Sequence, residues 1–313
     1  MIYTVTLNPC VDKTLNVEKA VVGGTNRVLS FDKSVCGKGI NTAVAINNLG
    51  YKVCAIIYEY TEGISAEAFL TGNGIQCKAI NVPGEIRTNV KIYDRSTSVT
   101  TEYNEKGHPI SSADAEKMFA LITDSINKGD VLVISGSTPP GIPTGFYRDV
   151  IIMAKKKGVY TILDADGDLM RLGLEAKPDL IKPNRDELSK LMETEIKTMG
   201  QAIECAEKLI RSGIGSVCVS MGKEGAIYLR DGVCLKAVNR INAVKGTVGA
   251  GDSMVAGFSI GVHEGKTPKE TLHIASAIAA GSVSLPSTEL CTLDLFRDMY
   301  EKVTLSSLPV TVA

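Results

Sequence analysis

Short runs of apolar residues alternate with helix-like segments from about residue 112 onward. In the first helical segment Met118, Leu121, Ile122 and Ile126 recur at the spacing of one helix face. Continuous apolar runs are typical of strands buried on both faces, and helices between them make right-handed crossovers. The pattern predicts a doubly wound, mostly parallel α/β sheet. Its strands are expected at 130–137, 158–166, 178–184 and 215–222, with helices at 144–157 and 199–212.

Three segments nearer the N-terminus break this rhythm, because they are more polar and partly alternate between apolar and polar residues: 13–20, 26–34 and 86–103. In the third, the sequence DRST (94–97) is typical of a hairpin turn. These sequence-separated pieces predict a small sheet with one wet face, inserted as a lid into the α/β core. An edge extension without a function is the alternative.

The chain length of 313 residues favours one domain with an appendage over two equal domains. We therefore expect a single domain over residues 1–313, with the lid formed by roughly 12–35 and 86–105. The last eight residues, SSLPVTVA, are expected to be loosely ordered.

Composition and charge narrow the function classes. Apolar residues make up 44% of the chain and charged residues 22%, and the formal net charge is −1. This net charge gives the protein no overall positive potential that would attract nucleic acid or an anionic membrane. No apolar run approaches the roughly 20 residues of a membrane helix. The eight cysteines form no C-x-x-C pair, the three histidines form no H-E-x-x-H motif, and no signal-peptide pattern is visible. We expect a cytoplasmic protein whose cysteines are buried thiols.

The segment KGTVGAGDSMVAGF (245–258) carries four glycines and one acid directly before a helix-like stretch. Small residues at a helix start leave N–H groups free, and the helix dipole adds positive charge, so Gly249, Ala250 and Gly251 predict an anion site. Asp252 beside this site makes chemical sense if it removes a proton from an alcohol that attacks a bound phosphoryl group. An Asp N-cap is the alternative, and the motif alone leaves both open.

A second motif, IKPNRDEL (181–188), follows an apolar run and begins a helix. Asn184 and Glu187 share a helix face and could hold a hydrated Mg²⁺ ion. The alternative is a capping box, which the motif alone favours. A third motif, VSMGKEGAIYL (219–229), puts a glycine turn at a strand end, where ligands bind in open α/β sheets. An ordinary hairpin is the more common explanation of such a turn.

Three basic side chains could clamp a phosphate together. Lys38 stands at the helix start in SVCGKGINTAVAINNLG (34–50), and Arg27 and Arg87 lie in the expected lid strands. Arginine offers a bidentate fork to a phosphate. Taken singly, each of the three is more often a solvated surface charge. Asp12 could accept hydrogen bonds from sugar hydroxyls, or it could be a turn residue.

Two segments resemble nucleotide-binding motifs but lack a feature that each motif requires. GVHEGKTP (261–268) has three residues between its glycines where a Walker A loop requires four, and it follows a helix. A helix–helix connection in which Pro268 opens the second helix explains it better. GKGINT (37–42) lacks the third glycine of a dinucleotide fingerprint, so NAD is not expected.

The order of the motifs along the chain resembles that of the ribokinase-like (PfkB-type) carbohydrate kinases. The matching segments are GKGIN near residue 37, SGSTPPG (135–141), KPNRDEL (182–188), SMGKEG (220–225) and TVGAGDSMVAG (247–257). The resemblance covers nearly the whole chain, and the glycine–aspartate motif is its most specific part. The opening TLNPCVD and the lysine of GKGIN are similar to the branch that acts on hexose phosphates.

The resemblance implies a ribokinase-like α/β fold with a small β-sheet lid, ATP as phosphoryl donor and Mg²⁺. Asp252 would be the catalytic base, the N–H groups of Gly249, Ala250 and Gly251 the anion hole, and Asn184 and Glu187 metal-handling residues that act through water. Residues implied for ATP binding are Lys182, Asn184, Ser220, Gly222, Lys223, Glu224, Gly225, Gly251, Ser276 and Ala279, the last two in a segment (273–287) near the adenine. Residues implied for the substrate are Asp12, Arg27, Gly37, Lys38, Asn41, Arg87, Ser137 and Asp252, among which Arg27, Lys38 and Arg87 would hold its phosphate.

The reaction implied by the resemblance is ATP-dependent phosphorylation of fructose 1-phosphate at its 6-hydroxyl. Tagatose 6-phosphate as the substrate, or a non-catalytic sugar-phosphate sensor, are the alternatives. Members of this family often dimerise through the lid, so a homodimer is expected. Two departures stand out: Lys245 and Gly246 occupy places where many relatives carry an acidic residue, and YEYTEGIS (58–65) lacks a glycine-rich turn.

Overall fold

A computed structural model describes residues 1–241, 244–286 and 288–309. Its main element is a ten-stranded sheet with the order β14-β13-β12-β11-β10-β9-β8-β1-β4-β5. Neighbouring strands from β11 to β5 run parallel, and β12, β13 and β14 extend the sheet by antiparallel pairing. The strands are β1 (Ile2–Thr6), β4 (Val53–Glu62), β5 (Gln76–Glu85), β8 (Val131–Ser135), β9 (Tyr160–Asp164), β10 (Leu180–Ile181), β11 (Ser216–Ser220), β12 (Ala226–Arg230), β13 (Val233–Asn239) and β14 (Val303–Leu308).

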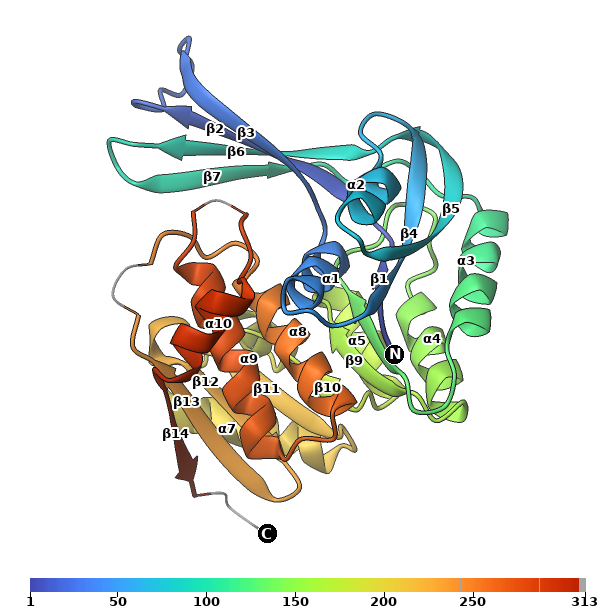
Figure 1. The fold of residues 1–313 in the computed structure, drawn as a ribbon, viewed down its shortest axis with the longest axis vertical. Coiled ribbons are helices and arrows are strands. Elements are labelled where there is room, and N and C mark those ends of the chain that lie inside the picture. Colours follow the sequence, from blue (N-terminus) through green and yellow to red (C-terminus); the bar gives the residue numbers. More distant parts are fainter. Residues whose placement is uncertain (242–243, 287, 310–313) are drawn as a thin grey trace.

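Helices cover both faces of this sheet, as Figure 1 shows, and the predicted mostly parallel α/β architecture is confirmed. Helices α1, α8 and α9 pack on one another on one face, and α3 to α7 pack in succession on the other. Strands such as β8 are wholly buried because every residue is apolar or small. The helices are α1 (Lys38–Asn48), α2 (Ala66–Gly72), α3 (Ser112–Ser125), α4 (Phe146–Lys156), α5 (Gly167–Glu175), α6 (Arg185–Leu191), α7 (Met199–Arg211), α8 (Ala250–His263), α9 (Pro268–Val283) and α10 (Leu293–Tyr300), with one 3₁₀ turn (Gly222–Glu224).

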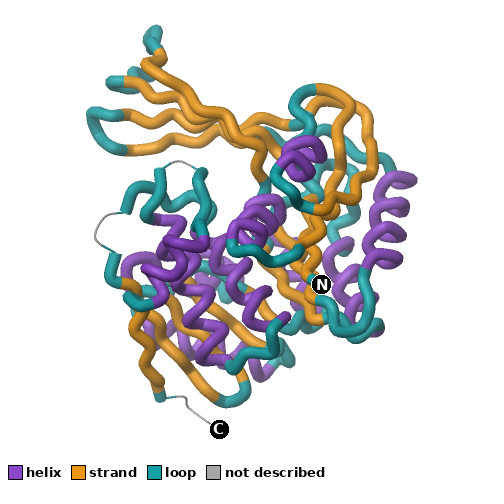
Figure 2. The backbone as a smooth tube through the Cα atoms, viewed as in Figure 1, coloured by secondary structure: helices purple, strands orange, loops and turns teal. Residues whose placement is uncertain are grey.

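A second sheet of four strands, here called the small sheet, is built from two separate parts of the sequence. Its order is β3-β2-β6-β7, and β2 and β6 pair in parallel. Figures 1 and 2 show it extending over the side of the molecule that carries α8, α9 and α10. Its strands are β2 (Cys10–Val17), β3 (Val28–Cys36), β6 (Arg87–Asp94) and β7 (Val99–Asn104).

The two faces of the small sheet differ in chemistry, because side chains alternate along each strand. On one face Leu15 stands opposite Phe31 and Ile92, and Val90 stands opposite Tyr103. Phe31 and Tyr103 are each 60% exposed, so this apolar face is turned to solvent. The opposite face is polar: its Asp12, Thr14, Asp32 and Ser34 line a cavity of about 340 Å³ whose far wall is formed by Pro286, Thr288 and Glu289. Lys33 also borders this cavity, but it stands opposite Lys13 and belongs to the face of Leu15 and Phe31.

The C-terminal segment is more ordered than its sequence indicates. Strand β14 pairs with β13 from Asn239↔Val303 to Cys234↔Leu308, so residues 306–308 are not loose as expected. Residues 310–313 of the predicted loose tail lie outside the described residues. In the part of the chain that the structure describes, no helix combines the length and apolar character that crossing a bilayer requires.

Candidate active site

The glycine-rich motif forms the N-terminus of α8. Gly249 is the N-cap residue and has φ 75°, a left-handed conformation that glycine adopts without strain. The Ala250 amide, which was expected in the anion hole, donates a long hydrogen bond of 3.4 Å to the Thr247 carbonyl. No described residue accepts a hydrogen bond from the N–H groups of Gly249, Gly251 or Asp252. Together with the positive end of the helix dipole, these groups form a site for an anion.

Asp252 is the third residue of α8, and its side chain does not cap the helix. The alternative interpretation as an Asp N-cap is therefore wrong. Its carboxylate is buried and accepts a hydrogen bond from Nδ2 of Asn41 over 2.7 Å. Burial and the nearby charge of Asp164 raise the pKa of Asp252 to about 6, against the lowering effects of Asn41, Lys38 and Lys182. A carboxyl that titrates near neutrality suits a general base.

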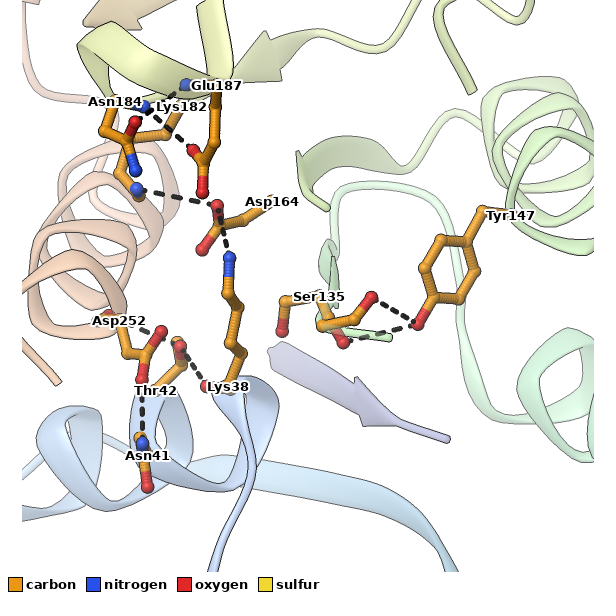
Figure 3. Close-up of polar contacts among 11 residues, drawn as sticks. Lys38, Asn41, Thr42, Ser135, Tyr147, Asp164, Lys182, Asn184, Glu187 and Asp252 are labelled. Atoms are coloured by element: carbon orange, nitrogen blue, oxygen red, sulfur yellow. Dashed lines mark hydrogen bonds and ion pairs between the residues drawn. The ribbon is translucent and has the colours of Figure 1, made fainter. Parts of the chain in front are cut away.

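Two lysines and one carboxylate lie beside Asp252. Oδ1 of Asp164 is 3.4 Å from Nζ of Lys38 and 3.5 Å from Nζ of Lys182, and Figure 3 shows the lysines reaching it from two sides. Burial alone would raise the pKa of Asp164, but Lys182 and Lys38 together lower it. Lys182 also borders the anion site, because a Cβ on Gly251 would lie 3.2 Å from its Nζ. The cluster thus supplies positive charge next to the free N–H groups.

Asn184 and Glu187 form a complete capping box at the start of α6. Oδ1 of Asn184 accepts from the Glu187 amide over 2.8 Å, and Oε2 of Glu187 accepts from the Asn184 amide over 2.9 Å. The alternative interpretation of this motif as a capping box is therefore confirmed. The other oxygen of Glu187 has no hydrogen bond to a described residue, and Figure 3 shows this carboxylate turned toward Asp164. No cluster of three His, Cys, Asp or Glu side chains suited to a metal occurs among the described residues.

A cavity of about 630 Å³ opens between the root of the small sheet and the loop after β8. Arg87 lines it, but its guanidinium is largely occupied: Nε and Nη2 donate to the Asn8 carbonyl, and Nη1 donates to Oδ1 of Asn89 and the Glu105 carbonyl. Of its five N–H groups, one on Nη2 remains, so the bidentate fork expected from Arg87 is not available in this conformation. Other residues that line the cavity include Asn8, Gly37, Lys38, Asn89, Lys106, Ser137 and Thr138.

Asp12 is buried at the root of the small sheet. Its Oδ2 accepts from Nζ of Lys91 over 2.6 Å, and its Oδ1 accepts from Nδ2 of Asn89 over 3.0 Å. It lies inside β2, so it is not a turn residue. Because two donors already hold the carboxylate, Asp12 has a fixed orientation on the polar face of the sheet.

A family model described as pfkB family carbohydrate kinase matches residues 5–294. The chain belongs to this family. Members of the pfkB family transfer a phosphoryl group to a carbohydrate alcohol, so the protein is a phosphotransferase, and ATP is the donor that this kinase chemistry implies. The family explains why an anion site and a buried carboxylate of raised pKa occur side by side.

Individual pfkB relatives cover the whole chain. A Bacillus subtilis protein named 1-phosphofructokinase is 33% identical over 98% of this chain and 100% of its own. A Staphylococcus epidermidis protein named tagatose-6-phosphate kinase is 31% identical over 97% of this chain and 98% of its own. The crystal structure of phosphofructokinase-2 from Escherichia coli with fructose 6-phosphate is 26% identical, covers 96% of this chain and 98% of its own, and has a TM-score of 0.88.

The residues that the resemblance implies for the nucleotide lie after β10, at the end of β11, in the turn that follows it, in the first turn of α8 and in α9. Ser220 ends β11 and forms an isolated bridge with Asn184, and Gly222–Glu224 form a 3₁₀ turn in the hairpin to β12. Glu224 pairs with Arg185, and Lys223 is exposed. In α9, Ser276 and Ala279 are buried, and the hydroxyl of Ser276 has no hydrogen-bond partner among the described residues. Residue 287, the last of the expected adenine segment, lies outside the described residues.

Three site features differ from what the sequence indicated. Asp164 was missed, although a carboxylate at the end of a parallel strand stands where α/β enzymes bind ligands. Asn41, expected to face the sugar, directs its amide to Asp252. Arg27 is exposed just before β3 and is not among the residues that line the 630 Å³ cavity, so it does not join Lys38 and Arg87 there.

Proposed function

We propose that the protein transfers the γ-phosphoryl group of ATP to the 6-hydroxyl of fructose 1-phosphate, giving fructose 1,6-bisphosphate. One observation carries the proposal above all: a buried carboxylate, Asp252, stands in the first turn of a helix whose free N–H groups and neighbouring lysine suit a phosphoryl group. The relative from Bacillus subtilis supports fructose 1-phosphate as acceptor.

In the proposed reaction Asp252 accepts the proton of the sugar hydroxyl as the oxygen attacks the γ-phosphorus. The bond from the γ-phosphorus to the bridging oxygen breaks, and ADP leaves with the electron pair. The amides of Gly249 and Gly251, together with Lys182, stabilise the charge on the phosphoryl oxygens, and the Ala250 amide would join them by releasing its long bond to Thr247. A positioned general base contributes about 10²–10⁴-fold to the rate.

The 630 Å³ cavity has the size of a small-molecule site and would hold the phosphate that the sugar already carries. Lys38 lines this cavity and reaches Asp164 as well, so it connects the acceptor site with the site of transfer. Ser137, Gly37 and the free N–H of Arg87 add hydrogen-bond donors there. Asp12, on the polar face of the small sheet, would accept from sugar hydroxyls.

The residues present are compatible with a magnesium ion that accompanies ATP. Asp164 and Glu187 each keep one carboxylate oxygen without a hydrogen bond to a described residue, and Mg²⁺ prefers one or two carboxylates plus water and phosphate oxygens. When bound, the ion would neutralise charge on the β- and γ-phosphates. Lys182, Asn184 and the 220–225 turn would border the phosphates, and Ser276 and Ala279 the adenine.

We also propose that the active form is a cytoplasmic homodimer assembled through the apolar face of the small sheet. Phe31, Tyr103 and Val99 are each more than half exposed on that face, while the opposite face lines the 340 Å³ cavity. A second copy of the same face would bury this surface and would stiffen the small sheet. All eight cysteines are free, which fits a reducing compartment.

The test is an ADP-coupled assay over fructose 1-phosphate, tagatose 6-phosphate, fructose 6-phosphate and fructose. The proposal expects the highest kcat/KM with fructose 1-phosphate and a product phosphorylated at both ends. A clear preference for tagatose 6-phosphate would transfer the assignment to that sugar phosphate, which the relative from Staphylococcus epidermidis makes the main competitor. Thermal stabilisation by sugar phosphates without ADP formation would indicate a sensor and would refute the catalytic proposal.

A further inference from the structure

Asn41 and Asp252 meet where the first turns of α1 and α8 face each other. Nδ2 of Asn41 donates to Oδ2 of Asp252 over 2.7 Å, as Figure 3 shows. The hydroxyl of the next residue, Thr42, has two acceptors for its one proton: the Lys38 carbonyl of its own helix at 2.8 Å and the main-chain carbonyl of Asp252 at 3.3 Å. Two consecutive residues of α1 therefore contact the side chain and the backbone of the same residue in α8.

The close approach of α1 to the strand beneath it fixes this geometry. A Cβ on Gly39 would lie 2.4 Å from Oγ1 of Thr6 and 2.7 Å from the Val5 carbonyl, so only glycine lets α1 sit so near β1. Gly37 is the N-cap, and its carbonyl accepts from the Asn41 amide over 2.8 Å. The position of the Asn41 side chain is thus determined by the backbone of the helix start.

The hydrogen bond occupies one oxygen of the carboxylate and leaves the other without a bond to a described residue. It also favours the charged form of the acid, because an amide N–H stabilises a carboxylate more than a neutral carboxyl. Asp252 engages one of the two N–H groups of the Asn41 amide, so Asn41 keeps one N–H and its carbonyl oxygen to offer a sugar hydroxyl. Its main contact in the structure is with the proposed base.

We propose that Asn41 is a positioning residue for the general base: its amide fixes Oδ2 of Asp252, turns Oδ1 to the acceptor hydroxyl and keeps the carboxylate ionised in neutral solution. The inference rests on the proposed function, since it needs Asp252 to act as the base.

Several charged or titratable groups face Asp252 from the elements packed around it. Burial and Asp164, at the end of β9, raise its pKa, whereas Asn41 and Lys38 of α1 and Lys182 after β10 lower it. The thiol of Cys36 in β3 also faces the carboxylate and stays neutral, because burial, first of all, raises its own pKa to about 12. Asn41 is the strongest of the groups that oppose protonation of Asp252.

The experiment compares kcat/KM against pH for the wild type, Asn41→Ala and Asn41→Asp, with the sugar phosphate that the substrate panel selects. Asn41→Ala removes the donor, and Asn41→Asp keeps the shape but places a second carboxylate at the same distance. Hydrogen bonds to charged groups are strong enough to shift the acid limb upward by on the order of one pH unit in Asn41→Ala. Asn41→Asp should shift it further, and both variants should regain activity at alkaline pH.

A measurement that does not depend on turnover accompanies the kinetics. The ¹³C-carboxyl resonance of Asp252, identified by its loss in Asp252→Asn, should titrate at higher pH in Asn41→Ala than in the wild type. Asn47→Ala is the matched control, because Asn47 lies on α1, is bonded to the Asn73 carbonyl and should leave both titrations unchanged.

The outcomes separate the inference from the proposed function. An active wild type whose acid limb and carboxyl titration do not move in either Asn41 variant overturns the positioning role. A higher KM at every pH with the acid limb unmoved also overturns it, because Asn41 would then only bind sugar. A wild type without phosphotransferase activity on any sugar phosphate would instead refute the function, whatever the carboxyl titration shows.

Discussion

The Nζ atom of Lys182 lies 3.5 Å from Oδ1 of Asp164, and the two side chains are only 4% and 1% exposed. Lys38 reaches the same oxygen from the other side over 3.4 Å. One carboxylate oxygen therefore compensates two positive charges deep in the site. Removing one partner of such a buried arrangement is costly, because the remaining charge is left without water or counter-charge.

Asp164→Asn should destabilise the fold and lower the pH at which the enzyme loses activity. Breaking a buried ion pair costs about 3–5 kcal/mol, which urea unfolding measures directly. Asp164 raises the pKa of Asp252, so its neutral replacement should move the acid limb of kcat/KM to lower pH. This shift is opposite in sign to that expected for Asn41→Ala.

The control for Asp164→Asn is Asp168→Asn, which removes a carboxylate from the exposed Asp168–Arg171 pair of α5. Exposed pairs contribute about 0–1 kcal/mol, so this variant should unfold almost like the wild type. If Asp164→Asn kept the stability of Asp168→Asn, the buried pair would not hold the site as argued here.

The sequence predicted those elements whose structure depends on neighbouring residues in the chain, such as buried strands and helix starts. The apolar runs at 130–137 and 215–222 contain β8 and β11, Pro268 opens α9, and Gly249 to Asp252 begin α8. Strand β14 was missed, because its order comes from pairing with β13, some 65 residues earlier, and not from its own composition.

The site was predictable in its residues but not in their pairings. The contacts that place Asp164 and Asn41 in the site are made with residues 18 to 211 positions away in the chain. These partners are Lys182 and Lys38 for Asp164, and Asp252 for Asn41. Whether an asparagine faces a sugar or a carboxylate depends on how two helix starts meet. Likewise, the occupied guanidinium of Arg87 follows from the carbonyls of Asn8 and Glu105, which no spacing in the sequence reveals.

Asp252→Asn should abolish catalysis while ligands still bind. The amide keeps the shape of the side chain but cannot accept the hydroxyl proton, so kcat should fall by about 10²–10⁴-fold. In the wild type, activity should fall about tenfold for each pH unit below about 6, since only the ionised carboxylate is active. Dissociation constants for ATP and sugar phosphate, measured by calorimetry, should stay near the wild-type values. An Asp252→Asn enzyme with wild-type turnover would remove the base from the mechanism.

The same variant should be more stable than the wild type at neutral pH. The folded pKa of Asp252 is about 6 and its ordinary value is 3.8, so folding stability falls as pH rises through this window and the carboxyl ionises. Two pH units correspond to about 3 kcal/mol, which Asp252→Asn should recover in large part above pH 6. The difference in Tm between variant and wild type should close as pH is lowered below 4. A difference in Tm that does not change with pH would contradict the ionisation of buried Asp252 as its cause.

Lys38→Met should weaken recognition of the phosphate that the acceptor carries. A charge-assisted hydrogen bond contributes about 1.5–3 kcal/mol, so KM for fructose 1-phosphate should rise roughly 10–100-fold, and much less for unphosphorylated fructose. Lys38 also lowers the pKa of Asp252, so the acid limb should move to higher pH. Lys52→Met, at an exposed lysine outside the cavity lining, is the control. Equal effects on both sugars would show that Lys38 serves the transferred phosphoryl group alone.

Phe31→Glu and Tyr103→Glu should convert the proposed dimer to monomers. Both side chains lie on the apolar face of the small sheet, where a glutamate would have to lose its water against the partner. Thr100→Glu adds the same charge to β7 on the opposite, polar face and should leave the dimer intact. Sedimentation velocity at micromolar concentration measures the assembly state. The monomeric variants should show a higher KM for the sugar phosphate, because the small sheet that carries Asp12 would be held less firmly. A wild type that sediments as a monomer would instead mean that the apolar face is not where two copies meet.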